Sequence, residues 1–384
     1  MRRWICVLMA LLMILLWLPA LADDSFIVVD EEENLAPDPR RQARALMRDM
    51  TPKEMIYQLF MVSPESVSDS DWVTKWKEGT LLENPVGGII LFGQNIVSEA
   101  QLRELTAAIQ ADAEKAGIYP LFIGVDEEGG AVSRVANKLG YELAPSPQAI
   151  GANGNSEEAF AAGSYLAGYL KPLGIHLAFS PVADVLLTDN EELGERAYGD
   201  DPLLVANMAA AMASGLRDGG VIPCYKHFPG HGSVSGNAHT GSASTRRTAD
   251  EMLACEWIPF QSGIHQGIEM IMTSHLIARG LGDEIPASLS PVVIQQYLRN
   301  TLGYDGVVIS DALRMAAITD HYKPGTAAKM AIEAGVDIIL LPGSFSAAVA
   351  AVEEAVANGE ISMTRIEESV ERILALKIQY GLIQ

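Results

Sequence analysis

The feature that most constrains the fold is a series of short apolar segments, rich in β-branched residues, that recurs along the chain. There are eight of them, at residues 58–63, 86–92, 121–126, 175–180, 222–227, 270–275, 306–311 and 336–341. Most are apolar throughout and do not alternate with polar residues, which is typical of strands in a parallel sheet buried on both faces. We therefore expect eight buried, parallel strands.

Amphipathic segments lie between and after these runs, at residues 98–116, 156–170, 201–218, 249–266, 290–300, 325–334, 346–358 and 364–380. Helix starts are marked by a capping residue followed by proline at Thr51-Pro52, Asp201-Pro202 and Ser290-Pro291. A strand–helix alternation repeated eight times predicts an α/β fold, a single (β/α)₈ TIM-like barrel domain over residues 51–384.

An open, doubly wound sheet is the alternative architecture. It would need a glycine-rich phosphate-binding turn after an early strand. The pair Gly129-Gly130 is the best placed for this, but it directly follows Glu127 and Glu128, whose negative charges would repel a pyrophosphate. The barrel is therefore favoured.

Residues 1–22 have the pattern of a secretory signal peptide. Arg2 and Arg3 precede an apolar run over residues 5–18, and Ala20-Leu21-Ala22 supplies small residues for cleavage after Ala22. The run is shorter than the roughly 20 residues that a membrane-spanning helix needs, which favours a cleaved signal peptide. An uncleaved membrane anchor is the alternative. Residues 23–50 form an acidic linker and N-terminal extension in this interpretation, and the protein is expected to be secreted or associated with the cell envelope.

The formal net charge of −22 argues against nucleic acid as a partner, because no basic stripe is available to displace counterions from phosphates. Outside the signal segment the chain has two cysteines, Cys224 and Cys255. A disulfide is permitted in an exported protein, but their spacing specifies none, and two free thiols are expected.

Polar residues follow five of the predicted strands at the same end of each, namely Asp126, Asp184, Lys226 with His227, His275 and Asp311. The active site of a barrel lies at the carboxyl ends of its strands, so these residues form a candidate site. Asp311 could act as a nucleophile toward an anomeric carbon or as a base, and Asp126 is suited to binding hydroxyl groups. Arg134 and Arg196 could supply the cations that keep these acids ionised.

Residues 224–239 form a loop rich in glycine, proline and histidine, with His227, His231 and His239. These histidines could in principle bind a metal. Their spacing matches no recognised pattern, however, and Lys226 would stand beside the ion. Neither a metal nor a cofactor is therefore expected.

Four segments, in this order, resemble the signatures of glycoside hydrolase family 3: VDEEGG at 125–130, GER at 194–196, KHFPGHG at 226–232 and ISDAL at 309–313. The resemblance extends from about Met50 to the end of the chain and is strongest to the β-N-acetylglucosaminidase branch, whose catalytic domain is a barrel. No second domain is expected after the eighth strand to supply an acid/base carboxylate.

The resemblance implies a role for each matching residue. Asp311 stands at the position of the catalytic nucleophile that forms a covalent glycosyl-enzyme. His239, on the loop after 226–232, stands at the position of the acid/base, a role for which the ordinary imidazole pKa near 6.5 is well suited. The positions that hold the sugar at the non-reducing end are matched by Asp126, Arg134, Arg196, Lys226 and His227.

One residue departs from the family pattern. Where the family loop carries an Asp that orients the acid/base histidine, this chain has Asn237. An amide supplies no charge to stabilise an imidazolium ion. The leading hypothesis is an exported, retaining exo-β-N-acetylglucosaminidase that acts on cell-wall or chitin-derived glycans. The alternatives are a sugar-binding homologue with weakened turnover and a glycosidase or transglycosylase of altered specificity.

Overall fold

The computed structural model describes residues 38–384 except 69, 191 and 235–242. The predicted signal peptide, most of the predicted acidic extension, and the site residues Asn237 and His239 lie outside the described residues. The eight predicted strands are all present, as β1 (Phe60–Val62), β2 (Gly88–Leu91), β3 (Phe122–Val125), β6 (Leu177–Ala178), β7 (Ile222–Phe228), β9 (Met270–Thr273), β11 (Val307–Ser310) and β12 (Ile339–Leu340).

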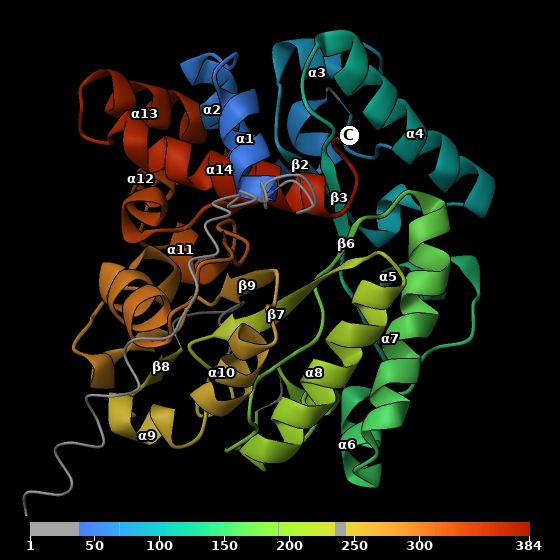
Figure 1. The fold of residues 1–384 in the computed structure, drawn as a ribbon, viewed down its shortest axis with the longest axis vertical. Helices are drawn as coiled ribbons and strands as arrows, with labels where there is room; N and C mark the ends of the chain where they lie inside the picture. The colour runs from blue at the N-terminus through green and yellow to red at the C-terminus, as the bar shows by residue number, and fades with distance from the viewer. Residues whose placement is uncertain (1–37, 69, 191, 235–242) are drawn as a thin grey trace, which may run out of the picture. The chain divides into compact units, whose positions relative to one another are not determined.

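These strands form one eight-stranded sheet in the order β11-β9-β7-β6-β3-β2-β1-β12, with every neighbouring pair parallel. The two end strands also meet. Ile309 and Ile338 form a parallel bridge, and the Ser310 N–H donates to the Ile338 carbonyl at 3.0 Å. The sheet is therefore nearly closed on itself, with helices around it (Figure 1), which confirms the predicted TIM-like barrel.

The helices of the described residues are α1 (Pro39–Met47), α2 (Pro52–Gln58), α3 (Thr80–Glu83), α4 (Glu99–Ala116), α5 (Arg134–Leu139), α6 (Pro147–Asn153), α7 (Ser156–Leu170), α8 (Pro202–Asp218), α9 (Ala249–Leu253), α10 (Trp257–His265), α11 (Ala316–Thr319), α12 (Pro324–Ala334), α13 (Phe345–Ala357) and α14 (Met363–Gln379), with short 3₁₀ turns between some of them. Residues Val292–Thr301 form a π-helix. Two small ribbons complete the secondary structure, β4 (Glu127–Gly129) with β5 (Val132–Ser133) and β8 (Ser244–Thr245) with β10 (Ile277–Ala278).

Local chemistry accounts for the helix starts. Thr51 and Glu54 form a reciprocal capping box at α2, and the Asp201 carboxylate accepts from the first N–H groups of α8. The segment expected as one helix over 249–266 is instead two, α9 and α10. Glu256 lies at the break, where its side chain is fully buried and pairs with Arg247. The spacing of apolar residues did not indicate that the Glu256 side chain points into the interior.

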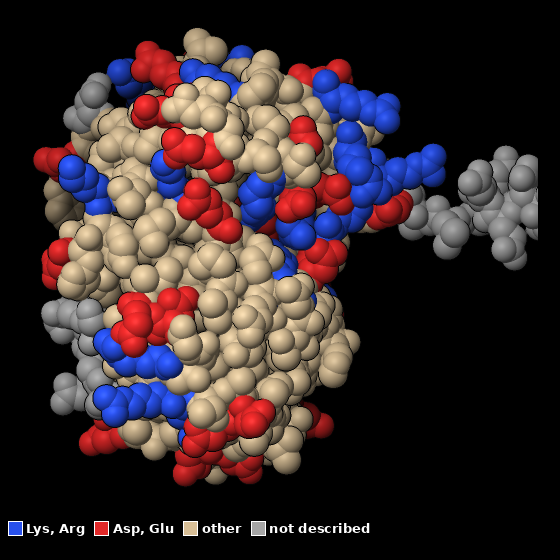
Figure 2. All heavy atoms as spheres, turned by 90° about the vertical axis from the view of Figure 1, so that its left-hand side faces the viewer, with Lys and Arg blue, Asp and Glu red and all other residues tan. Residues whose placement is uncertain are grey.

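Helix α1, which the sequence pattern did not indicate, packs against α14. Arg44 contributes an ion pair to Glu371 of α14 at 2.8 Å, and Arg40 contacts Glu371 and Asp305 at 3.4 and 3.1 Å. Figure 2 shows one face of the molecule, on which Lys and Arg side chains stand beside Asp and Glu side chains.

A further sequence expectation concerns the cysteines. Cys224 and Cys255 are both free thiols, the first buried and the second partly buried. None of the helices within the described part of the chain is both long and apolar enough to span a bilayer.

The interior holds a lysine without a charged partner among the described residues. Lys377 of α14 is fully buried, its Nζ donates to Gln58 Oε1 at 2.8 Å, and it lies 5.1 Å from the centre of the Phe122 ring. Burial lowers the pKa of this ammonium group to about 7, because a charge in an apolar environment loses its hydration.

This lysine makes the stability of the barrel depend on pH. Between pH 7 and 10.5 Lys377 is largely deprotonated in the folded protein but protonated in the unfolded chain, so the unfolded state binds more protons and stability rises with pH. We expect the free energy of unfolding to gain at most about 1.4 kcal/mol per pH unit from this group. Urea titrations of the wild type and Lys377→Met between pH 7.5 and 9.5 measure this contribution. The same change of unfolding free energy with pH in both proteins would contradict it.

Candidate active site

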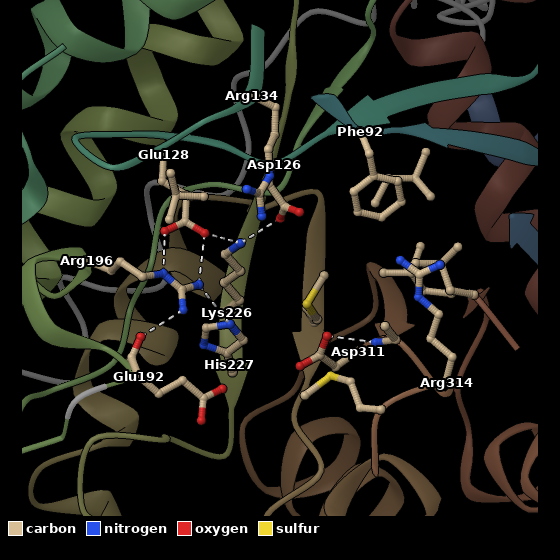
Figure 3. A pocket seen from close by; sticks show the side chains of 17 residues that line it. Phe92, Asp126, Glu128, Arg134, Glu192, Arg196, Lys226, His227, Asp311 and Arg314 are labelled. Atoms are coloured by element: carbon tan, nitrogen blue, oxygen red, sulfur yellow. Dashed lines mark hydrogen bonds and ion pairs between the residues drawn. The ribbon is translucent and has the colours of Figure 1, made fainter. Parts of the chain in front are cut away.

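The carboxyl ends of the strands enclose a pocket of about 320 Å³ (Figure 3), within the range of ordinary small-ligand sites. Loops and strand ends from β2, β3, β6, β7, β9, β11 and β12 contribute to it. Its lining residues are Ile90, Phe92, Asp126, Glu128, Val132, Arg134, Glu192, Arg196, Lys226, His227, Met272, Asp311, Ala312, Arg314, Met315, Leu340 and Leu341.

One wall of the pocket is a network of charged groups centred on Glu128. Arg196 binds this carboxylate through two nitrogens, Nε at 2.8 Å and Nη2 at 2.9 Å, and Lys226 Nζ approaches its Oε1 at 2.5 Å. Lys226 also donates to Asp126 Oδ1 at 3.2 Å. Two cations and two carboxylates therefore alternate along this wall, with Asp126 still 22% exposed toward the pocket.

The network fixes the ionisation of its members. Burial raises the pKa of Glu128, but Lys226 and Arg196 outweigh it and bring the value to about 2. Burial alone would lower the pKa of Lys226, yet Glu128 and Asp126 raise it above its ordinary value. Glu128, Lys226 and Arg196 are therefore charged at neutral pH, and the wall presents both hydrogen-bond donors and acceptors to a polar ligand.

A third carboxylate, behind this wall, holds the histidines of β7 and its loop. Asp184 is fully buried, and its Oδ2 lies 2.7 Å from His227 Nδ1 while its Oδ1 accepts from the His231 backbone N–H at 2.6 Å. This contact turns His227 Nε2 toward the pocket wall, where it lies 3.5 Å from Arg196 Nη2. The buried His231 ring lies behind the pocket and 4.0 Å from the carboxylate of Glu192.

Asp311 directly follows the apolar strand β11 and lies at the centre of the pocket. Its backbone N–H donates to Thr273 of β9 at 2.8 Å, which fixes the strand end, and its Oδ1 accepts from the Ala312 N–H at 2.7 Å. Figure 3 shows the carboxylate between the charged wall and the opposite side of the pocket.

The surroundings keep Asp311 ionised. Burial raises the pKa of its carboxyl group, but His275, His227 and Lys226 together with the Ala312 N–H hold it below its usual range. His275 is itself fixed, because its Nε2 donates to the Ala312 carbonyl at 2.9 Å and its Nδ1 lies 2.8 Å from the Ser288 hydroxyl. A half-buried carboxylate that stays charged and keeps one oxygen uncommitted to the backbone can act as a nucleophile.

The six predicted site residues that the structure describes all line this one pocket: Asp126, Arg134, Arg196, Lys226, His227 and Asp311. Asp184 and His275 lie directly behind it. The catalytic and binding roles remain predictions, as do those of Asn237 and His239, which the described residues do not include.

Four other charged or aromatic residues line the pocket and were not assigned from the sequence, namely Phe92, Glu128, Glu192 and Arg314. Glu128 had one signal in the sequence, since it lies two residues beyond Asp126 and three beyond the end of β3. Its negative charge was interpreted only as an obstacle to phosphate binding. Arg314 likewise lies three residues after Asp311, on the same loop.

Comparison with known proteins decides the family. Residues 51–376 match the model of the glycosyl hydrolase family 3 N-terminal domain. The chain belongs to glycoside hydrolase family 3. The predicted family and the predicted enzyme class, glycoside hydrolase, are thereby confirmed.

Relatives of this family 3 chain extend over most of its length. It is 32% identical over 337 residues to beta-hexosaminidase LpqI of Mycobacterium tuberculosis, covering 85% of this chain and 83% of the relative. It is 37% identical over 277 residues to a beta-hexosaminidase of Stenotrophomonas maltophilia, covering 70% and 80%.

Among solved structures, the family 3 β-N-acetylglucosaminidase from Paenibacillus sp. str. FPU-7 matches with a TM-score of 0.82 and 36% identity. The match covers 87% of this chain but 63% of that one, so this chain spans somewhat less than two thirds of the Paenibacillus protein. The fold of the barrel is therefore shared with a protein named as a β-N-acetylglucosaminidase.

Proposed function

We propose that this chain is an exported, retaining exo-β-N-acetylglucosaminidase that removes terminal, non-reducing N-acetyl-β-D-hexosamine residues. The observation that carries the proposal is the position of Asp311, an ionised carboxylate in the same pocket as the charged wall of Asp126, Glu128 and Lys226. The names of the relatives support the choice of sugar.

The proposed binding of the sugar follows from the charged wall. A non-reducing-end sugar presents hydroxyl groups that both donate and accept hydrogen bonds, and the wall offers both kinds of partner within a few ångströms. Asp126 is the exposed acceptor, while Lys226 and Arg196 offer donors. Arg134, at the pocket edge, has no ion pair with any described residue and is available to the ligand.

The proposed reaction has two steps. In the first, an Asp311 oxygen attacks the anomeric carbon, the bond to the glycosidic oxygen breaks, and the departing oxygen receives a proton from His239. In the second, water gives a proton to His239 while its oxygen attacks the anomeric carbon and releases Asp311. The sugar then leaves with its original anomeric configuration. His239 takes this role from its place in the sequence motif.

Export and the natural glycan are also part of the proposal. The pattern of residues 1–22 supports passage across a membrane with cleavage after Ala22, and hence a place outside the cell or in its envelope. Cell-wall fragments and chitin-derived sugars are the N-acetylglucosamine glycans found there, so turnover of peptidoglycan is the proposed physiological setting.

The test uses residues 23–384 and two matched substrates, 4-nitrophenyl N-acetyl-β-D-glucosaminide and 4-nitrophenyl β-D-glucoside. We expect kcat/KM for the first to be at least about 100-fold higher than for the second. A site that binds a particular group of its substrate discriminates by at least this order against a substrate that lacks the group. Proton NMR of the first product formed should show the β-anomer. Efficient hydrolysis of the glucoside, or an α-anomer as first product, would overturn the proposal.

Asn237 favours one alternative, a sugar-binding homologue with little turnover. In that case N-acetylglucosamine binds while the aryl glycoside is not hydrolysed, and Asn237→Asp raises kcat. A transferase would instead give more than one product when phosphate is added to the assay. If the wild-type chain hydrolyses the aryl glycoside and phosphate leaves the product unchanged, both alternatives are excluded.

A further inference from the structure

Two of the pocket-lining residues are exposed to solvent, and both are arginines. The side chains of Arg134 and Arg314 are exposed, whereas the other lining residues are buried or half-buried. Arg134 stands beside Asp126 at the charged wall, and Arg314 stands on the other side of Asp311 (Figure 3). The mouth of the pocket therefore carries a guanidinium group on each side.

Arg314 is held in place by an aromatic ring. Its guanidinium carbon lies 5.0 Å from the centre of the Phe92 ring, which comes from the loop after β2, while Arg314 comes from the loop after β11. A cation over an aromatic face is attracted to the ring, and stacking leaves the edge of the guanidinium, with its N–H groups, open to another partner.

Arg314 and Arg134 differ in their pairing from the other two cations of the site. Lys226 and Arg196 are neutralised by Asp126 and Glu128. Arg314 makes no ion pair with a carboxylate in the part of the chain that the structure describes. On a chain of net charge −22, this leaves a local positive group at the mouth of the pocket.

The position of Arg314 indicates which part of a substrate it meets. The charged wall binds the sugar at the non-reducing end, and the anomeric carbon of that sugar lies at Asp311. The rest of the glycan must protrude through the mouth, past the exposed residues. Arg314 therefore faces the aglycone, the part of the substrate that leaves.

We propose that Arg314 is a specificity-determining residue that selects substrates whose first aglycone sugar carries a carboxylate. This inference rests on the proposed function and identifies the class of aglycone. A guanidinium edge binds a carboxylate through two parallel N–H···O hydrogen bonds, while a neutral sugar offers single hydroxyl groups. Phe92 positions the guanidinium group for this contact.

The test compares two disaccharides with the same non-reducing N-acetylglucosamine, joined β-1,4 to N-acetylmuramic acid or to its lactyl methylamide, which has no charge. We expect Arg314→Gln to lower kcat/KM for the acid roughly tenfold, as for the loss of a charge-assisted hydrogen bond, and to change the value for the amide less than about twofold. Arg314→Lys should retain part of the preference. Raising the salt concentration should reduce the wild-type preference, because screening weakens an exposed pair.

Arg48→Gln is the matched control, since Arg48 is an exposed arginine that does not line the pocket and its substitution makes the same change in net charge. It should leave both rates unchanged. Equal effects of Arg314→Gln on the two disaccharides would overturn the inference, as would a wild type with no preference for the acid. If the wild type hydrolyses neither disaccharide nor the aryl glycoside, it is the proposed function that fails.

Discussion

Replacing Asp311 by Asn is expected to lower kcat for an aryl N-acetyl-β-glucosaminide by at least about 10⁴-fold, the order seen when a nucleophile of a catalytic unit is removed. The amide has the shape of the carboxylate, and its oxygen can still accept from the Ala312 N–H. It carries no negative charge with which to attack the anomeric carbon. The pocket and its charged wall remain in place.

Measurements of stability and rescue separate this chemical role from a structural one. The thermal midpoint of Asp311→Asn should stay within a few degrees of the wild type, because the amide keeps the shape of the carboxylate and can still accept from the Ala312 N–H. Azide added to Asp311→Gly should restore product formation and give a glycosyl azide of inverted configuration, as the small anion occupies the place of the carboxylate. A variant that keeps wild-type kcat would contradict the assignment.

Replacing Glu128 by Gln is expected to have the second largest effect, on stability as well as on substrate binding. Arg196 and Lys226 both rely on this buried carboxylate, and without it two nearby cations remain with Asp126 alone. Removal of one partner from a buried ion network typically costs about 3–5 kcal/mol. The distorted wall should also raise KM for the aryl glycoside more than it lowers kcat.

The pH dependence of unfolding provides an independent check on Glu128. Its pKa of about 2 in the folded protein is lower than its ordinary value of 4.5, so its contribution is complete above pH 4.5 and is lost as the pH falls toward 2. The difference corresponds to about 3 kcal/mol. Urea titrations from pH 6 to 3 should show a smaller loss of stability in Glu128→Gln than in the wild type. If the free energy of unfolding fell equally with pH in both proteins, Lys226 and Arg196 would not be stabilising the ionised form of Glu128.

The barrel could be predicted from the sequence because its signals are local. Each strand is an apolar run whose neighbours in the sheet are the preceding and following runs, and the capping residues Thr51 and Asp201 mark helix starts directly. Polar residues at strand ends then had to meet at one end of the barrel. This is why Asp126, Lys226 and Asp311 could be placed together without a structure.

The functions of neighbouring residues could not be predicted in the same way. Glu127 and Glu128 are adjacent and identical, yet Glu127 accepts the N–H groups of Val135 and Ala136 at the start of α5 while Glu128 faces the pocket. The choice depends on Arg196 and Lys226, which come from distant parts of the chain. Periodicity carries no information about such pairs.

The contact of Arg314 with Phe92 was missed for the same reason. It joins the loops after two strands that are distant in sequence, and neither residue belongs to a motif. The inward turn of Glu256, which divides the helix expected over 249–266, also depends on a partner, Arg247, that no local pattern identifies.

The central claim is that Asp311 forms a covalent bond to the sugar, and trapping that bond tests it most directly. A 5-fluoro N-acetylglucosaminyl fluoride should glycosylate the enzyme faster than the intermediate is hydrolysed. The ring fluorine disfavours the positive charge that develops in both steps, while the departing fluoride speeds only the first. Mass spectrometry of the intact protein should show the addition of one sugar, and peptide mapping should place it on Asp311. An adduct on another residue, or turnover of the reagent by Asp311→Ala at the wild-type rate, would contradict the account.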